Sequence, residues 1–171
     1  LSLDIGHILC HFADMNEITL IQDLLIEAQN QKWFTGTPRH LNYQLMSGKA
    51  LACIGVRRCG KSTFLHQIME RLLNEGIPQE DFIYLNFFDD RLEPVRKGRL
   101  DLITEAYFSL YPEKRGRGAL HCFLDEIQLC SGWEGFTDRL LRVEHMGVYL
   151  SGSSARLLAH EVGTAMRGRA L

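Results

Sequence analysis

The chain has 171 residues, with 19 Lys and Arg against 21 Asp and Glu, and 46% of its residues are apolar. This composition is typical of one folded domain and excludes an intrinsically disordered chain. A net charge of -2 gives no overall basic footprint for nucleic acid, and the lack of any run of about 18 apolar residues excludes a membrane-spanning helix.

Residues 1–44 are expected to form an N-terminal leader followed by one amphipathic helix. Asn16 has the side chain of a helix N-cap, and apolar residues recur at helical spacing after it, which predicts a helix over 16–32. A turn-rich stretch, TGTPRH, follows at residues 35–40.

The remaining chain, residues 45–171, alternates short apolar runs with helical patterns. The run at 50–56 has no polar alternation, which is typical of a strand buried on both faces. A helix is predicted over 61–74, ended by Gly76 and Pro78. Further strands are predicted over 82–87, 120–125 and 147–151, and further helices from about residue 100 to Pro112, from a Ser131–Glu134 capping box to residue 143, and from Ser153 or Ser154 to about residue 160.

Strands that alternate with helices predict an α/β fold with a mainly parallel sheet. Ligands of such sheets bind beyond the carboxyl ends of the strands. Three polar motifs follow the first, third and fourth predicted strands, so we expect them to share one site.

The strongest motif is the sequence GVRRCGKST, which starts at Gly55 and matches the phosphate-binding pattern G-x-x-x-x-G-K-[ST]. Its glycines let the backbone curl so that N–H groups point at phosphate, and the following helix adds the positive end of its dipole. Lys61 is expected to reach the β- and γ-phosphates, the Ser62 hydroxyl to bind Mg²⁺, and Thr63 to approach the α-phosphate. The predicted nucleotide-binding residues are Gly55, Arg58, Cys59, Gly60, Lys61, Ser62 and Thr63.

The second motif is the acidic pair Asp125 and Glu126 at the end of the third predicted strand. An acid at this position holds Mg²⁺ in P-loop enzymes, so Asp125 joins Ser62 as a predicted metal ligand. Glu126 is the predicted catalytic base that orients or deprotonates an attacking water. A polar strand end that merely opens a loop is the alternative.

Two weaker signals follow. Ser151 or Ser153, after the fourth strand, is a candidate sensor that hydrogen-bonds the γ-phosphate or the attacking water; a turn with a helix N-cap explains each serine equally well. Arg167 and Arg169 are candidate catalytic arginines, because an arginine that reaches the γ-phosphate accelerates hydrolysis. A solvated loop is the alternative for both.

The cysteines predict neither a disulfide framework nor a zinc site, because their number is odd and no Cys-x-x-Cys pair occurs. A reduced, cytoplasmic setting is therefore expected. The basic, Gly-rich stretch at 113–118 is compatible with a nucleic-acid contact, but a solvated loop explains it better. The cysteines are Cys10, Cys53, Cys59, Cys122 and Cys130.

The motifs GVRRCGKST, LDEIQ, GSSARLL and MRGR, in this order, resemble the predicted bacterial and archaeal ATPases of the AAA type over about residues 45–171. The resemblance implies a three-layer, RecA/AAA-like P-loop NTPase fold with the fourth strand between the first and the third. It also implies ATP and Mg²⁺ as ligands and a homo-oligomer that supplies an arginine in trans. Similar proteins often cover the adenine with the segment before the P-loop, which here is residues 35–40.

Such ATPases usually continue into another strand and a C-terminal domain, so this chain is expected to be a truncated ATPase domain without either. Two functions remain open from the sequence: an ATPase whose hydrolysis drives a conformational cycle, and a nucleotide-gated binding switch that hydrolyses little or no ATP. A GTPase is disfavoured because the chain has neither an Asn-Lys-x-Asp motif nor an Asp-x-x-Gly after the second strand. Glu126 argues against a small-molecule kinase, which needs no water-activating base.

Overall fold

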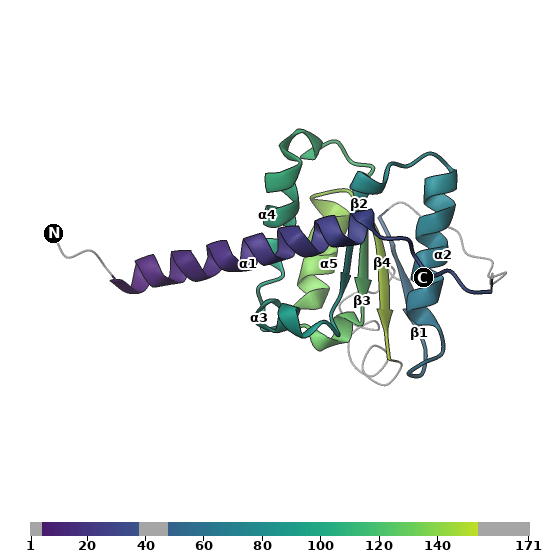
Figure 1. Ribbon diagram of the computed structural model, residues 1–171, viewed down its shortest axis with the longest axis horizontal. Coiled ribbons are helices and arrows are strands. Elements are labelled where there is room, and N and C mark those ends of the chain that lie inside the picture. The colour runs from purple at the N-terminus through teal and green to yellow at the C-terminus, as the bar shows by residue number, and fades with distance from the viewer. Residues whose placement is uncertain (1–4, 38–47, 154–171) are drawn as a thin grey trace.

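The computed structural model describes residues 5–37 and 48–153, with side chains from Asp14 onward. Its centre is a four-stranded sheet in which every neighbouring pair is parallel (Figure 1). The order β1-β4-β3-β2 confirms the expected α/β fold and the expected place of the fourth strand between the first and the third. The strands are β1 (Ala50–Ile54), β2 (Phe82–Asn86), β3 (His121–Asp125) and β4 (Gly147–Gly152).

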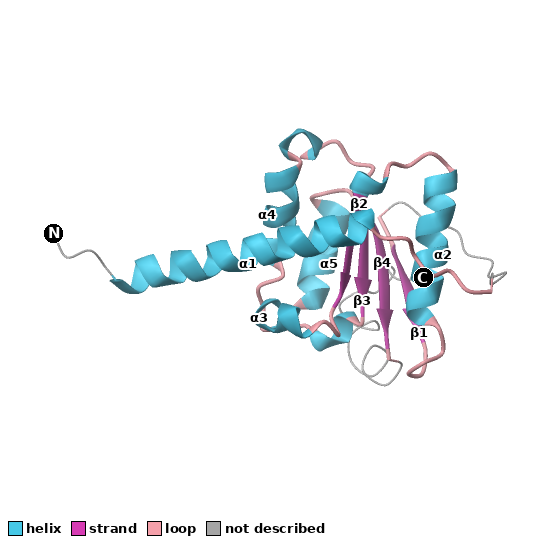
Figure 2. Cartoon of the chain, viewed as in Figure 1, coloured by secondary structure: helices cyan, strands magenta, loops and turns pink. Residues whose placement is uncertain are grey.

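Helices cover both faces of the sheet, which gives three layers (Figure 2). On one face α2 (Lys61–Asn74) packs against aromatic side chains such as Phe123 and Tyr149. On the other face α4 (Asp101–Leu110) and α5 (Trp133–Arg142) pack against aliphatic side chains such as Leu124. Successive residues of a strand point to opposite faces, so each strand contributes to both layers of the core.

The first helix, α1 (Ile5–Asn30), begins well before Asn16, so the predicted N-cap at that residue is wrong. No proline interrupts the chain between Ile5 and Asn16, and the helix therefore continues through the expected leader. Its C-terminal half packs against α4 and β2, whereas its N-terminal end projects beyond the sheet (Figure 1). The buried contacts are made by Ile21, Leu24, Leu25 and Ala28.

The predicted capping box at the start of α5 is also wrong. The helix begins after Gly132, which has a φ of 74° and caps it without a side-chain hydrogen bond. The backbone N–H of Ser131 instead donates to the carbonyl oxygen of Arg96 at 2.8 Å, at the end of the short helix α3 (Glu93–Arg96). This tertiary contact fixes Ser131 outside the helix. The last predicted helix, from Ser153 or Ser154, lies outside the described residues.

The basic stretch at 113–118 is largely bound to the domain itself. Lys114 Nζ lies 2.5 Å from Asp81 Oδ1 and 4.8 Å from the centre of the Tyr111 ring. The guanidinium of Arg115 lies 4.4 Å from the centre of the Phe108 ring. These contacts occupy Lys114 and Arg115 within the domain itself, which disfavours a nucleic-acid contact by these two side chains.

The four cysteines whose side chains the structure describes are free thiols. Burial raises the pKa of Cys130 to about 12 and also raises the pKa of Cys122, so both remain protonated and unreactive at neutral pH. Within the described ranges, no helix combines the length and the apolar character needed to cross a membrane.

Leu25→Ala tests whether α1 is an integral part of the domain rather than a separate leader. Leu25 is fully buried in the core, so we expect the substitution to lower the free energy of unfolding by about 2–5 kcal/mol. Ile26→Ala is the matched control, because the neighbouring Ile26 is 41% exposed and its loss should cost little. Urea denaturation measures the free energy of unfolding of both variants. Equal values for the two would show that α1 is not part of the core.

Candidate functional site

Three of the predicted motifs meet at the carboxyl ends of the strands. The loop after β1 lies beside the end of β4, where Gly55 N donates to the carbonyl oxygen of Gly152 at 3.3 Å. Strand β3 lies on the other side of β4 and ends at Asp125. The sheet order therefore brings the first, third and fourth strand ends together, as the sequence predicts for one shared site.

The loop of the phosphate-binding motif curls tightly before α2. A Cβ atom on Gly55 would lie 2.6 Å from Cys59 Sγ, so any other residue at this position would require the Cys59 side chain to move. Gly60 caps α2 with a φ of 87°, and Arg58 also has a left-handed backbone, with a φ of 64°. Left-handed residues of this kind turn successive N–H groups toward one concave surface. The first turn of α2, which holds Ser62 and Thr63, adds its own N–H groups to that surface.

The lysine of the motif is enclosed at the base of this loop. Lys61 is only 4% exposed, and its Nζ donates to the carbonyl oxygen of Val56 at 3.2 Å. The same Nζ lies 3.3 Å from Glu126 Oε1. The lysine and the predicted catalytic base are thus direct partners in this structure.

Asp125 is fully buried, and both of its carboxylate oxygens accept hydrogen bonds from hydroxyl groups. Ser151 donates to Oδ1, and Tyr84 donates to Oδ2 at 3.3 Å. The Ser151 Oγ also accepts the backbone N–H of Glu126 at 3.0 Å. The only hydroxyl proton of Ser151 is therefore engaged by Asp125, and a contact from this proton to a γ-phosphate would require that bond to break.

Glu126 has an unusual backbone conformation for a residue with a side chain. Its φ of 57° and ψ of 42° are left-handed, which costs about 1–3 kcal/mol and is characteristic of functional sites. Its Oε2 accepts a hydrogen bond from Gln128 Nε2 at 2.6 Å, while its Oε1 faces Lys61. The side chain is therefore held at both oxygens, directly above the end of β3.

The sequence analysis missed Tyr84 and His66, which the structure adds to the site. His66 Nε2 lies 3.3 Å from the Tyr84 hydroxyl, and the ring of Trp33 packs against both of these rings at tilted angles. Burial raises the pKa of Tyr84 well above its usual value and lowers the pKa of His66. The register pairs Tyr84 with Phe123 and Asn86 with Asp125, which places all four residues on one face of the sheet. The sequence alone does not contain this register.

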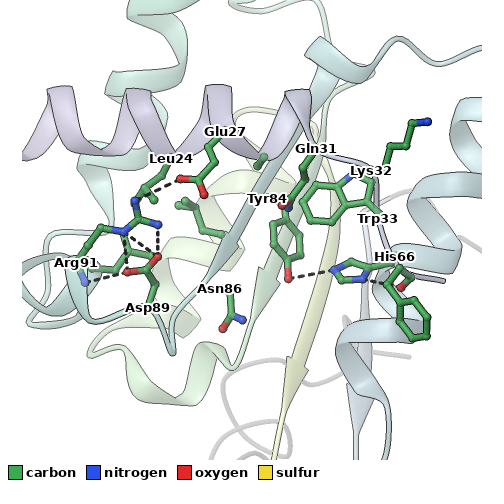
Figure 3. Close-up of a pocket in the computed structure, with 14 residues that line it drawn as sticks. Leu24, Glu27, Gln31, Lys32, Trp33, His66, Tyr84, Asn86, Asp89 and Arg91 are labelled. Atoms are coloured by element: carbon green, nitrogen blue, oxygen red, sulfur yellow. Dashed lines mark hydrogen bonds and ion pairs between the residues drawn. The ribbon is translucent and has the colours of Figure 1, made fainter. Parts of the chain in front are cut away.

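A cleft of about 380 Å³ lies next to this group, between the C-terminal end of α1 and β2 (Figure 3). Tyr84 and His66 form one side of it, and Arg91, paired with Glu27 and Asp89, forms the other. None of its lining residues belongs to the loop 55–60, so the cleft is distinct from the predicted phosphate site.

Part of the stretch expected to cover the adenine lies against α2. Gln67 Nε2 donates to the carbonyl oxygens of Thr35 and Thr37 at 2.6 and 2.8 Å. A Cβ on Gly36 would lie 3.2 Å from the Thr63 side chain. Thr35–Thr37 is therefore fixed beside the first turn of α2, while residues 38–40 lie outside the described part.

The oxygens of Ser62 and Asp125 suit Mg²⁺, which is bound in nucleotide sites by one or two protein oxygens together with substrate phosphates. In the described part of the chain, no group of three or more His, Cys, Asp or Glu side chains could hold a metal without such a ligand. Ser62 and Asp125 thus supply oxygen donors of the class that a magnesium–nucleotide site uses. The predicted arginines Arg167 and Arg169 lie outside the described residues.

Comparisons with known proteins identify the family of this chain. Residues 47–171 match the family model of an AAA domain. The chain is 34% identical over 133 residues to an uncharacterized protein of Methanocaldococcus jannaschii, and 32% identical over 117 residues to one of Haemophilus influenzae. These alignments cover 78% and 67% of this chain but only 27% and 28% of the relatives, so the chain spans about a quarter of their length. No solved structure was found to match. The match over residues 47–171, together with the fold, shows that the chain belongs to the AAA domain family of P-loop proteins.

Proposed function

We propose that this protein binds Mg·ATP at residues 55–63 and hydrolyses it to ADP and phosphate. The observation that carries this proposal is the enclosed pair of Lys61 Nζ and Glu126 Oε1, 3.3 Å apart beside the buried Asp125. With Lys61 as the cation for the phosphates, Asp125 as the metal ligand and Glu126 as the general base, these neighbours would supply the set of groups that ATP hydrolysis requires.

The loop and the first turn of α2 bind the phosphates through backbone N–H groups. Lys61 supplies the charge for the β- and γ-phosphates, and Thr63 approaches the α-phosphate. Ser62 and Asp125 would hold Mg²⁺, which when bound neutralises charge on the β- and γ-phosphates. Thr35–Thr37, fixed beside α2 by Gln67, supports the proposal that this segment lies over the adenine.

Glu126 accepts a proton from the water that attacks the γ-phosphate. In the structure its Oε1 faces Lys61, so an incoming γ-phosphate competes with Glu126 for the lysine. When the phosphate takes the lysine, Oε1 is released to the water while Gln128 still holds Oε2. Ser151 or Ser153 remains the proposed sensor; for Ser151 this role requires its hydroxyl to leave Asp125.

Arg167 or Arg169 of a neighbouring copy is the proposed source of the final positive charge at the γ-phosphate. P-loop enzymes without such an arginine are slow, so we expect the isolated chain to turn over at about 10⁻⁴ to 10⁻² per second. A homo-oligomer is proposed on this ground.

A nucleotide-gated switch is the second candidate, and the Lys61–Glu126 pair favours it. If the γ-phosphate displaces Glu126 from Lys61, the nucleotide-free and nucleotide-bound states differ at the end of β3 whether or not hydrolysis follows. The two functions share one site and differ in rate.

A thermal shift measured together with phosphate release tests both functions. ATP with Mg²⁺ at 100 times its Kd should stabilise the protein by about 2.7 kcal/mol, which raises the melting temperature by about 5–10 °C. Stabilisation with phosphate release supports the ATPase, and stabilisation without release supports the switch. An equal shift with GTP would remove the preference for adenine, and no shift with either nucleotide would overturn the proposed site.

A further inference from the structure

We propose that Tyr84 is a positioning residue for the metal-binding carboxylate of Asp125. The inference rests on the proposed magnesium–nucleotide site and adds to it a residue from β2, the strand farthest from the phosphate-binding loop. Its basis is the hydrogen bond from the Tyr84 hydroxyl to Asp125 Oδ2, at 3.3 Å.

The position of the phenol is fixed by its neighbours. Tyr84 is 8% exposed, and its ring centre lies 4.5 Å from that of Trp33 and 5.4 Å from that of His66. His66 is fixed in turn, because its Nδ1 lies 3.1 Å from the carbonyl oxygen of Phe34, which can only accept a hydrogen bond. Nε2 of the same ring then faces the phenol oxygen at 3.3 Å, as Figure 3 shows.

Two hydroxyl donors together determine how the Asp125 carboxylate is turned. Ser151 holds Oδ1 from β4 and Tyr84 holds Oδ2 from β2, so the carboxylate cannot rotate without breaking a hydrogen bond. Each carboxylate oxygen has two lone-pair sites, which leaves one on each for a metal ion or a metal-bound water. Carboxylate ligands are commonly oriented by such partners, whose loss costs about 10- to 100-fold in metal affinity or activity.

The single proton of Tyr84 has two possible acceptors, Asp125 and His66. The carboxylate is the stronger one, because hydrogen bonds to an ionised acceptor are about twice as strong as those between neutral groups. The Tyr84 hydroxyl therefore donates to Asp125.

The support of Tyr84 comes from a part of the chain outside the matched AAA region. Trp33 and Phe34 follow α1 and precede residue 47, where the family match begins. The carbonyl oxygen of Phe34 holds the ring of His66, and Trp33 packs on His66 and Tyr84, so this segment reaches the metal-binding carboxylate through two side chains. The end of α1 thus contributes to the geometry of the nucleotide site.

Tyr84→Phe tests the inference, because it removes the hydroxyl and keeps the ring. We expect the Mg²⁺ concentration for half-maximal ATP hydrolysis to rise by about 10-fold or more. ATP binding measured in EDTA, and the melting temperature in EDTA, should stay close to the wild-type values. A structural role alone would lower the melting temperature without moving the magnesium requirement.

Tyr149→Phe is the matched control. Tyr149 is a buried tyrosine of β4 on the same face of the sheet, and its hydroxyl lies 2.9 Å from Nδ1 of His121. Its magnesium requirement should match that of the wild type. A wild-type magnesium requirement in Tyr84→Phe would overturn this inference alone. No magnesium-dependent nucleotide binding in the wild-type protein would overturn the proposed function, and this inference with it.

Discussion

Glu126→Gln should bind ATP more tightly than the wild-type protein and should hydrolyse it about 10²- to 10⁴-fold more slowly. The amide has nearly the shape of the carboxylate but cannot accept the proton of the attacking water. It also removes the negative charge that engages Lys61 Nζ at 3.3 Å in the nucleotide-free protein. In the variant, the γ-phosphate of ATP therefore no longer competes with a carboxylate at position 126 for Lys61.

Two measurements separate these effects. Calorimetric titration with a non-hydrolysable ATP analogue gives the affinity, and single-turnover phosphate release over hours gives the rate. Glu70→Gln, an exposed change on α2, is the control and should alter neither. Turnover at the wild-type rate in Glu126→Gln would remove Glu126 from its role as base. Weaker analogue binding would contradict the proposed competition for Lys61.

Most of the fold follows from local patterns in the sequence. The four apolar runs that predict strands contain the four strands of the sheet, except that β4 extends one residue further, to Gly152. The runs mark the strands because strands buried on both faces have few polar residues. Helix α2 has the predicted bounds, since the phosphate-binding motif sets its start and Gly76 its end. The two incorrect helix starts, at Asn16 and Ser131, have a common origin. Both residues have side chains that commonly cap helices. Asn16 lies inside α1 because the helix continues through it, and Ser131 lies outside α5 because its backbone N–H is bound to Arg96.

The candidate site shows the same division. That Lys61 and Asp125 lie close together follows from the rule that ligands bind at the carboxyl ends of parallel strands. This rule does not predict which acceptor the Ser151 hydroxyl binds, because that depends on how β4 pairs with β3. The contribution of Tyr84 depends likewise on the pairing of β2 with β3. Hydroxyl groups with several possible partners are assigned by tertiary structure, and a single sequence does not contain the register.

Lys61→Ala should weaken ATP binding severely. Removing one partner of a buried, hydrogen-bonded charge contact costs about 2–5 kcal/mol, which is roughly a 30- to 5,000-fold loss of affinity. The nucleotide-free protein should also become less stable, because Glu126 then retains a charge in a pocket where its own exposed fraction is 10%. Urea denaturation without nucleotide and titration with the ATP analogue measure the two losses. Lys97→Ala, at an exposed position, is the control.

The double variant Lys61→Ala/Glu126→Gln separates the structural loss from the functional one. With both side chains uncharged, no unpaired charge remains, so most of the stability lost in Lys61→Ala should return. ATP binding should not return, because the phosphates still lack their cation. If the double variant recovers ATP binding as well, then Lys61 supports the fold rather than the nucleotide, and the loop and α2 bind the phosphates through backbone N–H groups alone. If the double variant recovers neither stability nor ATP binding, the unpaired charge of Glu126 does not explain the stability lost in Lys61→Ala.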